Sequence, residues 1–372
     1  MPFPNDEVLL KTAADVVAGL QGVFGKHPGF RPAHAKGKLL SGTFTPSAEA
    51  KKLSTAPYLN NPSTPVWVRF SNSTGIPNIP DNDGNADPRG IAIRFILGDR
   101  KHTDLIAHST PFFPARTGAE FGAFIQAIAN SPSDAPHPTP VEQFLGSHPH
   151  TLAFVQAPKP PPVSYATEAY YGITALKFID ADGKATFFRT IVEPAAGVLT
   201  LDAEAAKAKD PDYLQKEIAE RVGAGPVSFK IKAQIAAEGD VTDDATVQWP
   251  AERPVVELGT FTLDAILPNG EKEAKYVIFD PIPRVQGIEP SDDPLLEMRA
   301  AIYLISILIS TSVSSPIITR KFRIRICENP QCKTQLVVVE SHGYEDESLK
   351  SSLASRVIDY FWPSWSSNTL DD

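Results

Sequence analysis

The chain has 372 residues, of which 42% are hydrophobic and 21% charged, enough for one large β-rich domain or two ordinary ones. Its formal net charge of −9 argues against nucleic acid or an anionic membrane surface as a partner. The sequence opens without a secretory signal, and its longest apolar run is too short to span a membrane. We therefore expect a cytoplasmic protein without a membrane span.

The numbers and positions of cysteine and proline indicate a protein without a disulfide framework and with long ordered connections. Two cysteines, Cys327 and Cys332, are too few for a disulfide framework. Their spacing suits half a metal site or a local disulfide, but we expect plain reduced thiols, as in an intracellular protein. The 35 prolines fall mostly between apolar runs, which indicates long connections rather than disorder.

The first part of the chain predicts one helix followed by four strands. Apolar residues at helical spacing indicate a helix over residues 6–25. The run 66–71 alternates, which places Trp67, Arg69 and Ser71 on one face of a strand. The other strands predicted here are 36–45, 90–97 and the short run 105–107.

The middle of the chain mixes helices and strands. Thr117 and Glu120 predict a capping box at the start of a helix over 117–128. A connection rich in Pro, His and Ser follows over about residues 131–164. Two of the next strands are expected to form a hairpin. The strands predicted here are 170–179, 185–192, 227–235 and 255–266, and the helices are 211–222 and 292–309.

These elements predict an α+β fold built on an antiparallel eight-stranded β-barrel, with helices in the insertions and at the ends. Half-polar, mostly hairpin-connected strands favour such a barrel, with a roomy or filled interior, over a doubly wound sheet. We divide the chain into an N-terminal helix over 1–25, a barrel core over 26–309 and an appendage of unknown role over 310–372. In the appendage we predict strands over 321–327 and 335–340 and a short helix near 349–360.

The helix over 292–309 is apolar on most sides, as expected of a helix enclosed by protein. Asp292 or Asp293 is expected to cap it. Arg299 and Tyr303 are four residues apart, so their side chains lie on one face. A guanidinium beside a phenol favours the phenolate, which is a hard anionic ligand suited to ferric haem. Arg-x-x-x-Tyr also arises by chance on helices, so this pair alone does not identify a site.

Further motifs accompany the Arg–Tyr pair along the chain. They are R-x-x-H-A-K-G at 31–37, V-R-F-S at 68–71, D-P-R-G at 87–90, D-L and T-P within 104–111, and F-D-P to D-D-P over 279–294. Each is weak singly, but together and in this order they resemble the haem catalase family over about residues 26–309. The resemblance is to its short members, the catalase-related peroxidases, which keep the barrel core and lose the outer arms.

The resemblance implies a catalase-like fold, haem b as cofactor and a role for each matching residue. His34 would be the catalytic base above the iron and Ser71 its hydrogen-bonding neighbour. Tyr303 would be the axial iron ligand, paired with Arg299. Two more residues, Arg31 and Arg69, would face the haem propionates, because a guanidinium fork suits a carboxylate. The arms and C-terminal domain of large members have no counterpart, so we expect a homodimer and no NADPH.

The chemistry of His34 is understandable from its side chain. Splitting a peroxide O–O bond requires a group that takes a proton from one oxygen and returns it to the other, and a neutral imidazole does this well. The alternative for His34 is a structural histidine that is hydrogen-bonded at the start of a strand. The alternative for Ser71 is an ordinary strand residue, and for Arg31 and Arg69 it is surface ion pairs. Some of the phenylalanines Phe112, Phe113 and Phe121 are expected to line the side of the haem on which peroxide binds. The alternative is that they are ordinary core residues.

Two positions depart from the family's pattern. Full-sized catalases carry an asparagine near the catalytic histidine, and in the corresponding run 107–111 the amide is either replaced by Ser109 or displaced to His108. A hydroxyl donates one hydrogen bond where an amide donates two, which favours oxidation of a small organic donor over dismutation. Relatives also carry an arginine about two turns after the tyrosine, where this chain has Ile309 and Ser310, and this predicts a weaker propionate anchor.

Three functions are consistent with the sequence. The first is a haem enzyme that consumes hydrogen peroxide or a small organic peroxide, by dismutation or by oxidising an organic donor. The second is a haem enzyme that rearranges fatty-acid hydroperoxides, which requires a long apolar channel. The third is a barrel that binds haem without turnover.

Overall fold

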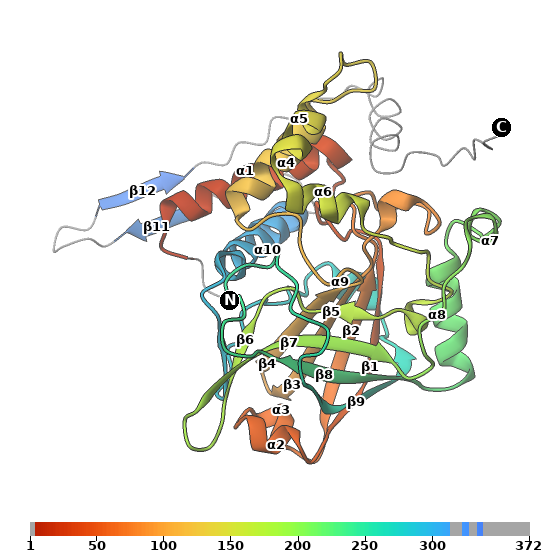
Figure 1. Cartoon of the computed structure of the whole chain (residues 1–372), viewed down its shortest axis with the longest axis vertical. Helices are drawn as coiled ribbons and strands as arrows, with labels where there is room; N and C mark the ends of the chain where they lie inside the picture. Colours follow the sequence, from red (N-terminus) through yellow and green to blue (C-terminus); the bar gives the residue numbers. More distant parts are fainter. Residues whose placement is uncertain (1–3, 313–321, 327–332, 338–372) are drawn as a thin grey trace.

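The computed structural model describes the backbone of residues 4–312, 322–326 and 333–337, and the side chains of residues 4–308. Eight antiparallel strands form a closed barrel in the order β7-β5-β4-β3-β2-β1-β9-β8, and pairing of β8 with β7 closes the ring (Figure 1). Its strands are β1 (Gly37–Pro46), β2 (Thr64–Ser71), β3 (Gly90–Gly98), β4 (Lys101–His108), β5 (Tyr170–Tyr171), β7 (Ala185–Pro194), β8 (Val227–Ile235) and β9 (Val255–Ile266). The predicted fold class is confirmed.

Two shorter strands extend the sheet beyond the ring. Strand β6 (Leu176–Ile179) pairs with β7, and β10 (Ile288–Pro290) pairs with β6. The predicted strand over 170–179 is therefore two strands, β5 and β6. The turn between β6 and β7 is the predicted hairpin, in which the Asp180 carboxylate accepts hydrogen bonds from the main chain of Asp182 and Lys184.

The inside of the barrel is filled by side chains. Along β2, Val66, Val68 and Phe70 point inward and are almost fully buried, while Trp67 and Arg69 lie on the outer face. Aromatic rings dominate the interior, among them Phe44, Phe70, Phe95, Tyr165, Tyr170, Phe229 and Phe261. Their packing leaves the outer face of the barrel as the place for a site.

Helices cover the end of the barrel that lies uppermost in Figure 1. They are α1 (Glu7–Phe24), α4 (Gly118–Ala129), α5 (Pro140–Ser147), α6 (Pro149–Gln156) and α10 (Pro294–Ser312). Helix α1 packs against α4, where Gly19 lies close to Ile125, and against α10, where Ala13 meets Met298 and Ala301. In the part of the chain that the structure describes, no helix is long and apolar enough to cross a membrane.

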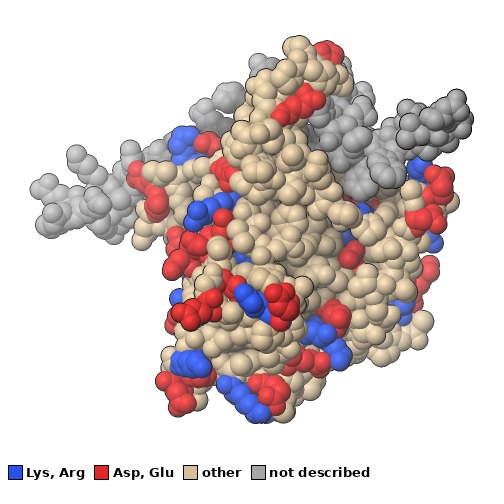
Figure 2. Space-filling model, viewed as in Figure 1, with Lys and Arg blue, Asp and Glu red and all other residues tan. Residues whose placement is uncertain are grey.

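Smaller elements lie around the rest of the barrel. They are α2 (Ala50–Leu53), α3 (Pro57–Asn60), α7 (Ala203–Lys207), α8 (Tyr213–Ala224), α9 (Gly270–Ala274), two 3₁₀ turns over Gly84–Ala86 and Tyr165–Thr167, and a separate hairpin of β11 (Phe322–Ile326) and β12 (Lys333–Val337). Figure 2 shows acidic and basic side chains interspersed over the face in view. The helix predicted near 349–360 and the two cysteines lie outside the described residues. The three-part division of the chain stays a proposal.

Several local predictions are confirmed or corrected. Asp293 caps α10, accepting a hydrogen bond from the Leu295 amide at 2.9 Å. The capping box of α4 is only half formed: Thr117 accepts from the Glu120 amide at 3.1 Å, but the Glu120 carboxylate binds the Arg116 amide and His150 instead. The connection over 131–164 contains two helices that the sequence analysis missed, α5 and α6, each beginning with a proline.

Candidate active site

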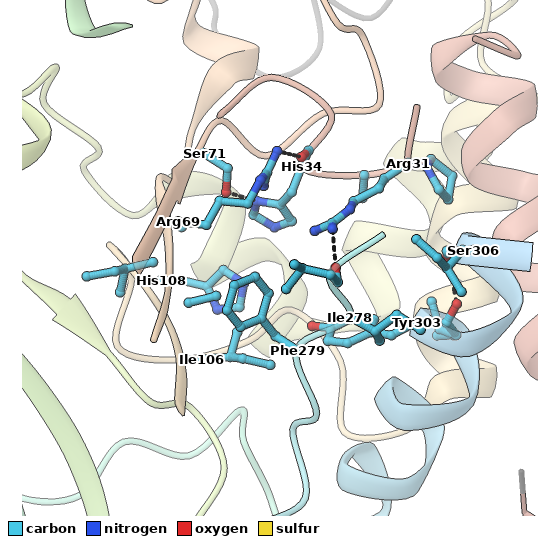
Figure 3. Close-up of a pocket in the computed structure, with 18 of the residues that line it drawn as sticks. Arg31, His34, Arg69, Ser71, Ile106, His108, Ile278, Phe279, Tyr303 and Ser306 are labelled. Atoms are coloured by element: carbon cyan, nitrogen blue, oxygen red, sulfur yellow. Dashed lines mark hydrogen bonds between the residues drawn. The ribbon is translucent and has the colours of Figure 1, made fainter. Parts of the chain in front are cut away.

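One pocket gathers residues from both ends of the described chain (Figure 3). It lies between the outer face of β2–β4 and helix α10, and its empty volume, open mouth included, is about 740 Å³. Its walls are largely apolar and include Leu20, Ile91, Ile106, Val277, Ile278, Phe279, Ile302 and Ile307. Largely apolar walls with a small number of placed polar groups are typical of cofactor and small-molecule sites.

His34 is held in this pocket by its backbone and by Ser71. Its φ of 54° lies in the left-handed region, which histidine adopts more readily than most residues. The backbone amide of His34 donates to the Ser73 carbonyl at 3.0 Å, and its carbonyl accepts from Arg69 at 2.9 Å. The ring Nδ1 lies 3.0 Å from the Ser71 hydroxyl. Because Ser71 engages Nδ1, the second ring nitrogen is left for a ligand in the pocket.

Two glycines of the sequence motifs make this packing possible. An ideal Cβ on Gly90 would lie 2.9 Å from Cε1 of His34 and 3.0 Å from the Ser71 hydroxyl. A Cβ on Gly37 would lie 2.7 Å from a terminal nitrogen of Arg69. Both positions require close approach by a neighbouring side chain, which glycine allows.

Burial and positive charge keep two imidazoles of the pocket neutral. The pKa of His34 is lowered to about 3, first by burial and then by the nearby guanidiniums of Arg69, Arg31 and Arg299. The pKa of His108 lies well below its ordinary value, again because of burial first, with His34 and Arg299 adding to the effect. At neutral pH His34 therefore has a lone pair free to accept a proton.

Arg31 and Arg69 lack a carboxylate partner in the described part of the chain. Arg31 donates to the carbonyls of Ala274, at 2.6 Å, and of Val277, and Figure 3 shows its guanidinium reaching between His34 and Tyr303. The Arg69 terminal nitrogen bonds to main-chain carbonyls, while its buried Nε has no hydrogen-bond partner. Burial lowers the pKa of Arg31 to about 10 and that of Arg69 to about 9. One buried and one half-buried guanidinium without counter-ions favour a ligand that carries carboxylates.

Tyr303 lies on α10, across the pocket from His34 (Figure 3). Nε and a terminal nitrogen of Arg299 each lie 3.3 Å from its phenol oxygen and donate to it. Arg299 is buried and stands behind the phenol rather than in the pocket wall. The structure thus brings all six predicted site residues together. Five of them line the pocket, and the sixth, Arg299, contacts Tyr303.

The strand ends next to the pocket are fixed by a buried polar network. Arg89 pairs with Asp87 at 2.9 Å and donates to the Asn72 amide oxygen at 2.7 Å. Asn72 in turn donates to Asp81 at 2.8 Å. Burial raises the pKa of Asp87 to about 6 despite Arg89. These bonds hold the residues that adjoin Ser71 and Gly90, so the D-P-R-G motif supports the site from behind.

A second ion pair holds the segment around Ile278 and Phe279, which forms another wall of the pocket. Arg94 binds both carboxylate oxygens of Asp104 at 2.8 Å, and Asp104 also accepts the Asp280 amide at 2.7 Å. Arg94 further donates to the Ile278 carbonyl and lies over the Phe279 ring. The F-D-P motif is thereby fastened to β3 and β4, and its Phe279 lines the pocket together with Val277 and Ile278.

The structure decides between two residues that the sequence left open. His108 lines the pocket, with its ring centroid 5.4 Å from that of His34. The Ser109 hydroxyl instead accepts a hydrogen bond from the Arg89 amide at 2.9 Å and does not line the pocket. The side chains of Ile309 and Ser310 lie outside the described residues.

The expectation for three phenylalanines is corrected. Phe112, Phe113 and Phe121 are not among the residues that line the pocket. Phe113 packs against Phe121, and Phe112 packs against Phe154. They therefore pack among other side chains, and the apolar residues named above form the pocket walls instead.

The residues present suit a haem. The phenol of Tyr303 offers an anionic oxygen ligand, the two uncompensated arginines suit propionates, and the walls suit a flat apolar ring. The orphaned Arg69 Nε is a polar atom that such a ligand would satisfy. Among the described residues no group of three or more His, Cys, Asp and Glu side chains could hold a bare metal ion.

Comparison with known proteins places this arrangement in a family. Residues 29–307 match the family model described as catalase. The chain belongs to the catalase family. It is 36% identical over 307 residues to a catalase-related peroxidase of Mycolicibacterium paratuberculosis, covering 81% of this chain and 96% of that protein. A catalase-related peroxidase of Synechococcus elongatus is 32% identical over 298 residues, covering 79% of this chain and 87% of the relative.

Larger catalases share the same core. Catalase-A of Dictyostelium discoideum is 28% identical over 291 residues, covering 73% of this chain and 58% of that protein. The solved structure of catalase A from Saccharomyces cerevisiae superposes with a TM-score of 0.68 at 21% identity, covering 77% of this chain and 62% of that one. The chain therefore corresponds to nearly the whole length of the short catalase-related peroxidases and to the core of the larger family members.

Proposed function

We propose that the protein is a haem-dependent enzyme that consumes hydrogen peroxide, by dismutation or by oxidising a small organic donor. The observation that carries the proposal is the placement of His34 and Tyr303, from opposite ends of the core, on opposite sides of one pocket. The names of the two short relatives, both catalase-related peroxidases, support the same reaction class.

Each residue of the pocket has a defined task in this proposal. When bound, haem b would supply the redox chemistry, including the two electrons, that cleaves the peroxide O–O bond. Tyr303 holds the iron, and Arg299 stabilises the phenolate form of Tyr303 by donating to its oxygen. Arg31 and Arg69 bind the cofactor's carboxylates, which for Arg31 would replace the carbonyls of Ala274 and Val277.

His34 moves the proton. Its free ring nitrogen accepts the proton of one peroxide oxygen and returns it to the oxygen that leaves as water. The Ser71 hydroxyl fixes the ring orientation through Nδ1. The low pKa of His34 keeps the ring unprotonated at neutral pH.

The test uses haem-loaded protein, an oxygen electrode and a haem absorbance spectrum. We expect His34→Ala to keep its haem while peroxide consumption falls by about 10²–10⁴-fold, the usual contribution of general acid–base help. His137→Ala is the matched control, because His137 is exposed and remote from the pocket. Near-normal turnover by His34→Ala would remove His34 from the mechanism.

The same experiment separates the competing functions. Oxygen release from hydrogen peroxide indicates dismutation, and peroxide loss that depends on an added phenol indicates peroxidase activity. Consumption of a fatty-acid hydroperoxide without oxygen release would indicate rearrangement, and an unchanging haem spectrum with no turnover would indicate a binding protein. A homodimer and a cytoplasmic location are further proposals, which light scattering and cell fractionation test.

A further inference from the structure

His108 is a polar side chain of the pocket that the proposed mechanism does not use. It is the last residue of β4, and its ring lies 5.4 Å from the His34 ring at an interplanar angle of 44° (Figure 3). Among the described residues, neither of its ring nitrogens has a hydrogen-bond partner, whereas His34 is bound by Ser71. His108 is half-buried, so its unpaired ring nitrogens are open to a ligand in the pocket.

Strand register explains why the two imidazoles face each other. Gly90 pairs with Ser71 across β2 and β3, and with His108 across β3 and β4. The three residues form one row on the outer face of the barrel, with glycine in the middle. A side chain at position 90 would meet the ring of His34 and the hydroxyl of Ser71. The missing side chain thus makes room for the ring of His34, which Ser71 holds, next to His108 at the other end of the row.

The charge state of His108 suits a hydrogen-bond donor and acceptor. Burial, together with His34 and Arg299, keeps this imidazole neutral at neutral pH. A neutral imidazole has one N–H donor and one lone pair, and neither is engaged by the protein. The neighbouring hydroxyl of Ser109 is unsuited to the task, because Ser109 does not line the pocket and its hydroxyl lies against the Arg89 amide.

We propose that His108 is a second catalytic residue of the peroxide site, whose ring N–H hydrogen-bonds the peroxide oxygen that leaves. This inference rests on the proposed function. As the O–O bond breaks, the proton of the retained oxygen passes to His34 and from there to the leaving oxygen, which departs as water. The two electrons come from the bound haem, and His108 keeps its own proton. His34 thus transfers the proton while His108 positions and polarises the bond that breaks.

The test compares His108→Asn with His108→Leu in haem-loaded protein. Asparagine and leucine are similar in size, so both variants lose the same packing, but only asparagine restores an N–H donor. We expect the second-order rate constant with hydrogen peroxide to fall about 10²-fold in His108→Leu, a loss typical of one missing donor in an active site. In His108→Asn we expect most of that rate to return.

A second readout does not depend on turnover. Cyanide is a small ligand of haem iron that fits the same space, and its dissociation constant is measured from the shift of the Soret band. We expect the constant to rise about tenfold in His108→Leu, the effect of one lost hydrogen bond, and to recover in His108→Asn. Ser109→Ala and His102→Asn are controls, since Ser109 faces away from the pocket and His102 is an exposed residue of the same strand.

The outcomes separate this inference from the proposed function. A wild-type protein that binds no haem or consumes no peroxide overturns both. An active wild type with His108→Leu within twofold of it, in both rate and cyanide affinity, overturns the role of His108 alone. Equal losses in the Leu and Asn variants would also overturn it, because the effect would then come from packing and not from the donor.

Discussion

His34 shows how strongly one residue is constrained at this site. Its left-handed backbone is held by hydrogen bonds from both its amide and its carbonyl, and its ring is held by Ser71. This arrangement lowers the unfolding free energy in acid. An imidazole whose pKa is depressed in the folded protein takes up a proton less readily than the same group in the unfolded chain.

The pH dependence of stability tests the state of His34. Its folded pKa of about 3 lies below the unfolded value of about 6.5, so acid favours the unfolded chain as the pH falls below 6.5. His34→Asn removes the titrating group, and asparagine tolerates the left-handed backbone. Relative to wild type, the apo variant should gain about 2 kcal/mol in unfolding free energy between pH 7 and pH 5, measured by urea denaturation. A difference that does not change with pH would show that His34 titrates normally.

The sequence identified the pocket residues that stand in recognisable motifs. It did not identify every residue that faces the pocket. His34, Ser71 and Tyr303 stand in motifs whose order could be read directly. Choosing between His108 and Ser109 required the register of β3 against β4, which decides whether a residue faces the pocket or the strand behind it. The register of this hairpin shifts between Ile96 and Gly98, and the local sequence does not show that shift.

The start of strand β3 contributes room to the site rather than a side chain, because its first residue is Gly90. In Gly90→Ala the added methyl would meet the His34 ring and the Ser71 hydroxyl, and both would have to move. We expect peroxide turnover to fall by about 10²-fold while the fold is kept, since a displacement of about 1 Å commonly costs that much. Turnover at the wild-type level would mean that the spacing of this row does not matter.

Gly22→Ala is the matched control on helix α1. Gly22 is exposed in the helix interior, and nothing lies within 4 Å of a Cβ built there. Alanine should raise the unfolding free energy by roughly 0.5–1 kcal/mol and leave turnover unchanged. A loss of stability on thermal or urea denaturation would contradict the helical assignment of this position.

The elements themselves were predictable to different degrees. Alternating strands such as β2 and β8 were placed to within a residue or two, because one face is buried and the other is not. Helices α5 and α6 were missed because a proline-rich stretch reads as a loop, although proline at the first helical position is favourable. The capping role of Glu120 was mispredicted because Arg116 and His150 compete for its carboxylate.

At the scale of the whole molecule, the barrel and the site are separate structures. The core inside the barrel is closed by aromatic packing, and the pocket lies on its outer surface under α1 and α10. The sequence predicted a barrel from its strand count and left open whether the interior is filled. Local periodicity does not report how side chains from distant strands fill a shared volume, so only the structure places the pocket outside.

Phe229→Ala tests this separation. Phe229 is fully buried in the barrel and packs against Phe70 and Phe261. The substitution should lower the unfolding free energy by about 3–5 kcal/mol, as cavities in a packed core do. In the haem-loaded protein at a temperature where it stays folded, peroxide turnover should remain within a fewfold of wild type. Loss of turnover in the folded variant would show that barrel core and site are coupled.

The most direct measurement is a haemin titration of wild type and Tyr303→Phe, followed by absorbance. Wild type should bind a single haem per chain with a ferric phenolate charge-transfer band, because Tyr303 supplies the anionic ligand. Tyr303→Phe should lose that band and bind haem weakly, while Tyr276→Phe, at an exposed tyrosine, should match wild type. An unchanged spectrum and affinity in Tyr303→Phe would contradict the assignment of the iron to this pocket.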